Sequence, residues 1–65
     1  MKTSKLVNYR VTFYDYMENE LYVKYFLAFD SKQLMRDVAW EVKTSNKAKA
    51  LGVHTYQFEL VTKNQ

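Results

Sequence analysis

The sequence contains no cysteine and no proline, and it has a single glycine. Without cysteine, neither a disulfide bond nor a thiolate metal site can supplement the core. One glycine cannot build a phosphate-binding loop, which needs several glycines at fixed spacing. The chain also has no linker-like stretch, so we expect one domain over residues 1–65, with frayed ends at 1–5 and 63–65.

Long hydrophobic runs are missing as well. No stretch of about 18 apolar residues and no signal-peptide pattern occurs, so we expect a cytoplasmic protein without a membrane segment. The charge balance is only mildly basic, with ten Lys and Arg against seven Asp and Glu. This balance suits nucleic acid binding and ordinary solubility equally well.

Side chains that could carry chemistry are few. His54 is the only histidine, and a general base needs a partner within hydrogen-bond reach. Asp15, Glu18 and Glu20 lie close together in the sequence, but their spacing matches no calcium-binding loop. We therefore predict a non-enzymatic protein with no catalytic residue, no metal site and no cofactor.

The chain is organised around one stretch with helical periodicity, Asp30 to Val42. Asp30 and Ser31 are good N-cap residues placed directly before it. Its apolar residues recur at the spacing of one helix face: Leu34, Met35, Val38, Ala39 and Val42. The next positions along this helix face are all polar, so the pattern predicts that the long helix stops near Val42 or Lys43.

A second short helix is expected from Asn46 to Leu51. Thr44 or Ser45 would be its N-cap, and Gly52 lies where a left-handed residue often ends a helix. One continuous helix to Leu51 is the alternative.

Three stretches have β-like patterns: residues 6–16, 21–29 and 53–62. A short turn at 17–20 makes the first two a hairpin, with Asn19 as the residue suited to a positive φ. Because a strand–helix–strand crossover returns a parallel strand, the third strand fits beside the first. The sequence therefore predicts an α+β fold of order ββαβ, a three-stranded antiparallel sheet (order 2-1-3) with one main helix on one face.

Alternation assigns each strand an inner face toward the helix. The expected inner residues are Val7, Tyr9, Val11 and Phe13 in the first strand, Leu21, Val23, Tyr25, Leu27 and Phe29 in the second, and Tyr56, Phe58 and Leu60 in the third. Phe13, Val38 and Phe58 are expected in the core. The uncovered face would then carry aromatic and basic side chains: Arg10, Thr12, Tyr14, Tyr16, Tyr22, Lys24 and Phe26.

The second strand is expected at a sheet edge, where Lys24 is its only charged residue. A long apolar edge strand invites pairing with another chain. We therefore expect Leu21–Phe29 to be covered in the working state, by a second copy or by a partner.

Trp40 is expected on the outer side of the helix, opposite the apolar stripe. Arg36, Lys43 and Lys47 lie near it on the helical wheel, and Trp and Arg are the residues that dominate interface hot spots. The alternative is that the ring folds back over the edge of the domain.

Two binding functions follow from these surfaces. The favoured one is a protein-binding module, with an inhibitor as one form of it, and the other is a module that binds single-stranded nucleic acid by stacking bases on the aromatic sheet face. The acidic hairpin tip and the weak net charge count against nucleic acid. Candidate binding residues are Tyr14, Tyr16, Glu18, Glu20, Tyr22, Lys24, Phe26, Arg36, Trp40, Lys43 and Lys47.

The hairpin YRVTFYDYMENELYVKYFLAF, the capped helix DSKQLMRDVAWEV and the closing strand GVHTYQFELV together resemble the small cysteine-free accessory proteins of bacteriophages. That group includes host-takeover factors and anti-CRISPR inhibitors. The resemblance covers the whole chain, rests on size, order and composition, and transfers no functional residue. It implies an inhibitor that binds a bacterial protein in the host cytoplasm.

Overall fold

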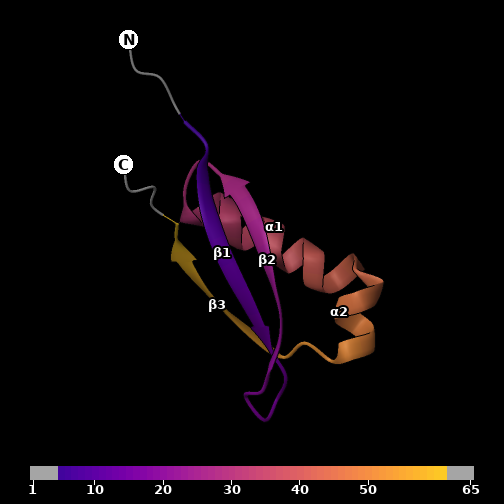
Figure 1. Cartoon of the computed structure of the whole chain (residues 1–65). Coiled ribbons are helices and arrows are strands. Elements are labelled where there is room, and N and C mark those ends of the chain that lie inside the picture. The colour runs from indigo at the N-terminus through magenta and orange to yellow at the C-terminus, as the bar shows by residue number, and fades with distance from the viewer. Residues whose placement is uncertain (1–4, 62–65) are drawn as a thin grey trace.

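The computed structural model describes residues 5–61. Its elements follow one another as β1 (Val7–Tyr14), β2 (Glu20–Ala28), α1 (Ser31–Thr44), α2 (Asn46–Leu51) and β3 (Thr55–Leu60) (Figure 1). Residues 1–4 and 62–65, which include most of the expected frayed ends and the expected last residue of the third strand, lie outside the described residues.

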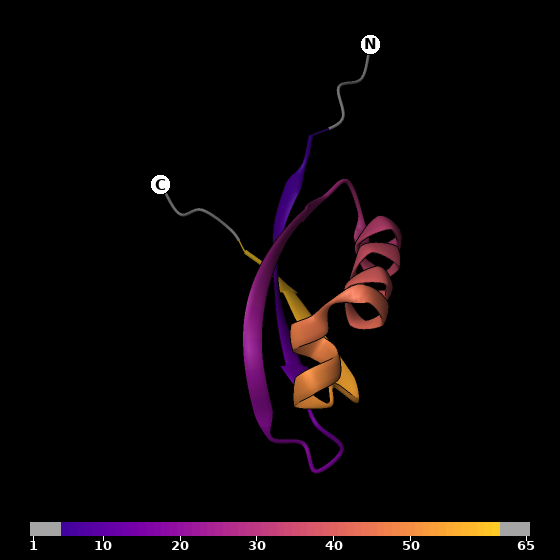
Figure 2. The ribbon, with the colours of Figure 1, turned by 90° about the vertical axis from the view of Figure 1, so that its right-hand side faces the viewer.

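The three strands form one antiparallel sheet in the order β2-β1-β3. Both helices lie on the same side of this sheet, and the other side is open (Figure 2). The predicted α+β architecture and strand order are therefore confirmed. No helix within residues 5–61 is both long enough and apolar enough to cross a membrane.

The helical segment breaks where the polar residues interrupt the apolar stripe. Asp30 caps α1 by accepting a hydrogen bond from the backbone N–H of Gln33 at 2.8 Å. Ser45 has extended backbone angles, and its hydroxyl accepts from the N–H of Ala48 to cap α2. Gly52 ends α2 with φ +76°. The predicted break, second cap and left-handed glycine are all confirmed.

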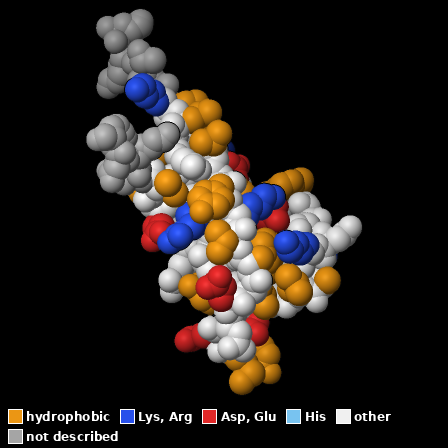
Figure 3. Space-filling model, in the orientation of Figure 1, with side chains coloured by type: hydrophobic (Ala, Val, Ile, Leu, Met, Phe, Trp, Pro, Cys, Tyr) orange, Lys and Arg blue, Asp and Glu red, His pale blue; other side chains and the backbone are white. Residues whose placement is uncertain are grey.

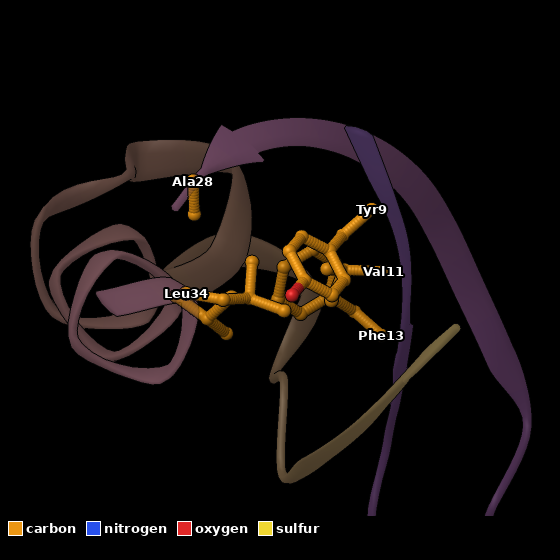
Figure 4. Packing of buried hydrophobic residues seen from close by; sticks show 6 residues of the cluster. Tyr9, Val11, Phe13, Ala28 and Leu34 are labelled. Carbon is orange, nitrogen blue, oxygen red and sulfur yellow. The ribbon is translucent and has the colours of Figure 1, made fainter. Parts of the chain in front are cut away.

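The core lies between β1 and α1. Tyr9, Val11 and Phe13 point from β1 toward Leu34 of the helix (Figure 4). The Phe13 ring stacks on that of Tyr22, with ring centres 4.6 Å apart. The inner face predicted for the first strand is therefore correct.

A β-bulge near the hairpin tip sets which side of β2 faces the helix. Tyr14 pairs with Glu20, but Phe13, the residue before Tyr14, pairs with Tyr22, which is two residues after Glu20. Leu21 is thus an extra residue without a pairing partner. Because side chains alternate along a strand, one extra residue transfers every later side chain to the opposite face.

The predicted faces of β2 are consequently wrong. Tyr22 and Phe26 pack against the core cluster, and Ala28 is fully buried within it. Lys24 is paired with the inward-facing Val11, so it too lies on the helix side. The side chains that project from the open face instead are Val23, Tyr25 and Leu27.

The helix also buries a narrower stripe than predicted. Leu34 and Val38 are fully buried, but Met35 and Ala39 are exposed. The half-buried Glu41 shows that the helix is rotated toward β2. A helix is about 10 Å wide and strands lie about 4.8 Å apart, so one helix covers roughly two strands. Phe58 of β3 is therefore 39% exposed rather than a core residue.

Candidate protein-interaction surfaces

An uncharged apolar row runs along β2 on the open side of the sheet. Val23, Tyr25 and Leu27 alternate outward, and the exposed fractions of Tyr25 and Leu27 are 56% and 59%. Leu6 and Phe29, which flank the paired residues Val7 and Ala28, continue the exposed apolar row. Figure 3 looks onto this face, where hydrophobic side chains gather along its upper half. We call these five residues the β2 row.

One ion pair crosses the sheet beside the β2 row. Arg10 of β1 lies opposite Tyr25 on one side and opposite Glu59 of β3 on the other. The Arg10 guanidinium donates to the Glu59 carboxylate. A shallow groove of about 290 Å³ adjoins this pair, with Tyr14 in its lining. The open face thus offers an apolar strip bordered by a neutralised charge pair.

The side chains of Lys24 and Tyr22 form hydrogen bonds with Glu41 of α1 and do not face solvent on the open side. The Lys24 ammonium lies 2.8 Å from one oxygen of Glu41, and the Tyr22 hydroxyl donates to the other at 3.3 Å. The hydrogen bond from Lys24 is the main reason that the pKa of Glu41 is lowered. Burial, followed by the negative charge of Glu41, raises the pKa of Tyr22.

The aromatic and basic side chains predicted for the open face are therefore not gathered there. Phe26 packs against the core, and the Lys47 ammonium lies 4.6 Å from the centre of the Tyr22 ring on the helix side. Of the side chains predicted for the open face, Arg10, Thr12 and Tyr14 are found there. Tyr25, which the sequence pattern assigned to the inner face of the second strand, is exposed on the open face.

Trp40 is exposed on the outer side of α1, as predicted. The exposed fraction of Trp40 is 65%, and its backbone oxygen accepts from the Thr44 hydroxyl one turn later. A hollow of about 430 Å³ lies against the ring, lined also by Arg36 and Lys43. Of the basic side chains predicted near Trp40, Arg36 and Lys43 are present here, whereas Lys47 lies over the Tyr22 ring instead.

The hairpin tip is a tight turn ordered by Asp15. Its carboxylate accepts from the backbone N–H groups of Met17 and Asn19, both at 2.9 Å, and the bond from Asn19 is the main cause of its lowered pKa. The positive φ predicted for Asn19 is found at Glu18 instead, at +66°. Tyr16 and Met17 are strongly exposed beside the acidic residues.

The sequence pattern missed the apolar residues of β2 that are exposed on the open face of the sheet. Val23, Tyr25 and Leu27 were assigned inward because both alternating sets of β2 are largely apolar. A small residue at position 28, where the helix packs closely, is the one weak signal for the true orientation. Within residues 5–61, no group of three His, Asp or Glu side chains is placed to hold a metal ion.

No family model matches this chain, and neither a curated protein nor a solved structure is significantly similar to it.

Proposed function

We propose that this chain is a non-enzymatic protein-binding domain whose contact surface is the open face of its sheet. The observation that carries the proposal is the β2 row, a continuous strip of exposed apolar side chains without a charge. Contiguous exposed apolar patches on small soluble domains usually mark interaction sites, because leaving them in water costs free energy.

The arrangement of the β2 row supports a specific contact. Tyr25 lies in the middle of the row, held on a strand that pairs with β1 along its length. An aromatic side chain on a rigid strand loses little conformational entropy when it binds, and tyrosine is enriched among interface hot spots. Arg10 lies directly across from Tyr25 and supplies a polar border.

A protein partner fits this face better than single-stranded nucleic acid. Base stacking needs several exposed rings beside free cationic groups. Tyr22 and Phe26 are packed inward, and Arg10 is already paired with Glu59. Three rings remain on the open side, Tyr14, Tyr25 and Phe29, and the cation that lies across from Tyr25 is the paired Arg10.

The proposed mode of action is occlusion. A binding domain without catalytic groups changes its partner by covering a surface or by blocking a movement. The resemblance to phage accessory proteins favours a bacterial host protein, such as a nucleic-acid-binding or defence complex, as the target. This would make the chain an inhibitor in the host cytoplasm.

A second copy is the other candidate occupant of β2. This strand is a sheet edge with exposed apolar side chains, which permits pairing between copies. Light scattering at high protein concentration tests this hypothesis. A monomer whose Leu21–Phe29 amides exchange quickly would count against the homodimer.

The experiment for the main proposal is affinity purification from bacterial lysate, with and without nuclease. The bait is compared with Leu27→Lys, which places a charge in the β2 row, and with Ala50→Lys, which adds the same charge to an exposed position on α2, on the other side of the sheet. We expect a protein that survives nuclease, is retained by Ala50→Lys and is lost with Leu27→Lys. Recovery of nucleic acid alone, or equal binding by both variants, would contradict the proposal.

A further inference from the structure

The outer side of α1 carries a second exposed surface. Trp40, Arg36 and Lys43 are separated by four and three residues, so they are neighbours on one helix surface. They line a hollow of about 430 Å³, together with Ala39 and Asp37. We call this surface the Trp40 site. Trp40 is exposed on the side of α1 away from the buried Leu34 and Val38. The helices cover one side of the sheet (Figure 2), and the β2 row projects from the other side.

The charge of the Trp40 site is predominantly positive. Arg36 and Lys43 lie within it, and Asp37 is its one carboxylate. Within residues 5–61, the two ion pairs join Arg10 to Glu59 and Lys24 to Glu41. The second carboxylate of α1, Glu41, is therefore bonded to β2 and does not neutralise the outer side.

The Trp40 site also offers a large apolar contact. The indole ring is 65% exposed, and the side chain of Ala39 beside it is small. An apolar side chain that enters the hollow would remove part of the ring from water. Nearby acidic groups could then pair with Arg36 and Lys43, whose aliphatic stems widen the apolar surface.

We propose that the Trp40 site binds an acidic protein segment that carries one apolar residue. The apolar residue packs on Trp40, and carboxylates on either side of it pair with Arg36 and Lys43. The positive border selects the acidic sequence, and the exposed ring supplies the anchor. Because the two surfaces lie on opposite faces, this inference goes beyond the proposed function and can be tested separately.

Charge and shape favour an acidic peptide over nucleic acid. The site has one exposed ring, whereas single-strand binding uses successive rings that stack successive bases. Asp37 lies inside the hollow and would repel a phosphate backbone that passed close to the ring. A short peptide can avoid Asp37, because its charges can be spaced around one apolar residue.

Trp40 is the only tryptophan in the chain, so its fluorescence reports this site directly. The probe is a synthetic nine-residue peptide with Leu at its centre and Glu residues spaced by Ser on either side of it. We expect a blue shift of Trp40 emission that saturates with a dissociation constant on the order of 100 µM, because one anchor and a few screened charges bind weakly. Affinity should fall at least about threefold between 50 and 300 mM NaCl.

Two matched variants separate the site from net charge. Lys43→Glu reverses a charge in the Trp40 site, and Lys5→Glu makes the same change at an exposed position before β1. We expect Lys43→Glu to weaken the peptide about tenfold and Lys5→Glu to weaken it less than twofold. Lys43→Arg should bind like the parent, and circular dichroism confirms that each variant is folded.

Three results would overturn the proposal. The first is the absence of any change in Trp40 emission up to millimolar peptide. The second is equal affinity for a peptide with Ala at its centre, since the anchor would then have no role. The third is a higher affinity for a ten-nucleotide oligothymidylate than for the peptide at the same salt concentration, which would assign the site to nucleic acid.

Discussion

The ammonium group of Lys24 lies 2.8 Å from a carboxylate oxygen of Glu41, and this contact joins the edge strand β2 to the C-terminal part of α1. Glu41 also accepts from Tyr22, so one helical side chain fixes two residues of the strand. The carboxylate is half-buried, and its bonds hold the pKa of Glu41 below the ordinary value of 4.5. Lys24 thus has a structural role rather than the guarding role expected at an open edge.

The lowered pKa of Glu41 predicts a loss of stability in acid. A carboxylate with a lower pKa in the folded state stabilises the fold at pH values above its unfolded pKa, and this contribution is lost as pH falls through the folded pKa. Glu41→Gln should therefore be less stable than the parent at pH 7, and the difference should shrink below pH 4.5. Urea unfolding from pH 7 to pH 3 measures it. Glu20→Gln, at an exposed position of β2, is the control, and equal curves for both variants would exclude this role of Glu41.

Phe13 is the side chain on which the core depends most. It is fully buried and contacts both Tyr22 and Tyr56. Phe13→Ala should cost about 3–5 kcal/mol, which matches the whole stability expected of so small a core. We expect this variant to be largely unfolded by circular dichroism. Phe13→Leu should lower the free energy of unfolding by about 1–2 kcal/mol, so its loss of stability can be measured in a folded protein. An unchanged melting temperature for Phe13→Ala would contradict the packing.

The bulge predicts an unusual tolerance to deletion. Removing Leu21 would let the pairing of Tyr14 with Glu20 continue directly into that of Phe13 with Tyr22. The side chains of β2 would therefore keep their faces, and we expect the variant to fold with a modest loss of stability. Deleting Tyr25 instead would put part of β2 out of register. Urea unfolding compares the two, and equal damage from both deletions would show that the bulge does not set the register.

Gly52 has a left-handed backbone conformation, with φ +76°. A Cβ added there meets no atom within 4 Å, so only backbone strain opposes a side chain. Gly52→Ala should therefore lower the unfolding free energy by about 1 kcal/mol. Gly52→Asn should cost less, since asparagine tolerates this region. The urea midpoints of the two variants test the order, and a more stable alanine variant would refute it.

Trp40 emission should resemble that of tryptophan in water, because most of its surface is exposed. Acrylamide should quench it readily. Iodide should quench it more than caesium does, because Arg36 and Lys43 attract anions to the ring. Added salt should reduce that preference. A blue-shifted emission that both ions fail to quench would contradict the exposed position.

The local features of this fold could be predicted from short stretches of sequence. Asp30 and Ser45 cap their helices through bonds to residues three positions ahead, and Gly52 needs only its own freedom at positive φ. The alternation of β1 is unambiguous, because its outward set is polar at Asn8, Arg10 and Thr12. Trp40 could be placed on the outer side of α1 because helical periodicity alone separates it from Leu34 and Val38.

Only the tertiary structure decided the orientation of β2 and therefore the surface proposed to bind. Its two alternating sets are both largely apolar, so burial energy alone separates them poorly. The choice is made by the extra residue Leu21, by the close fit of Ala28 under the helix and by the bond between Lys24 and Glu41. These contacts join positions distant in the sequence, and together they leave Val23, Tyr25 and Leu27 in water.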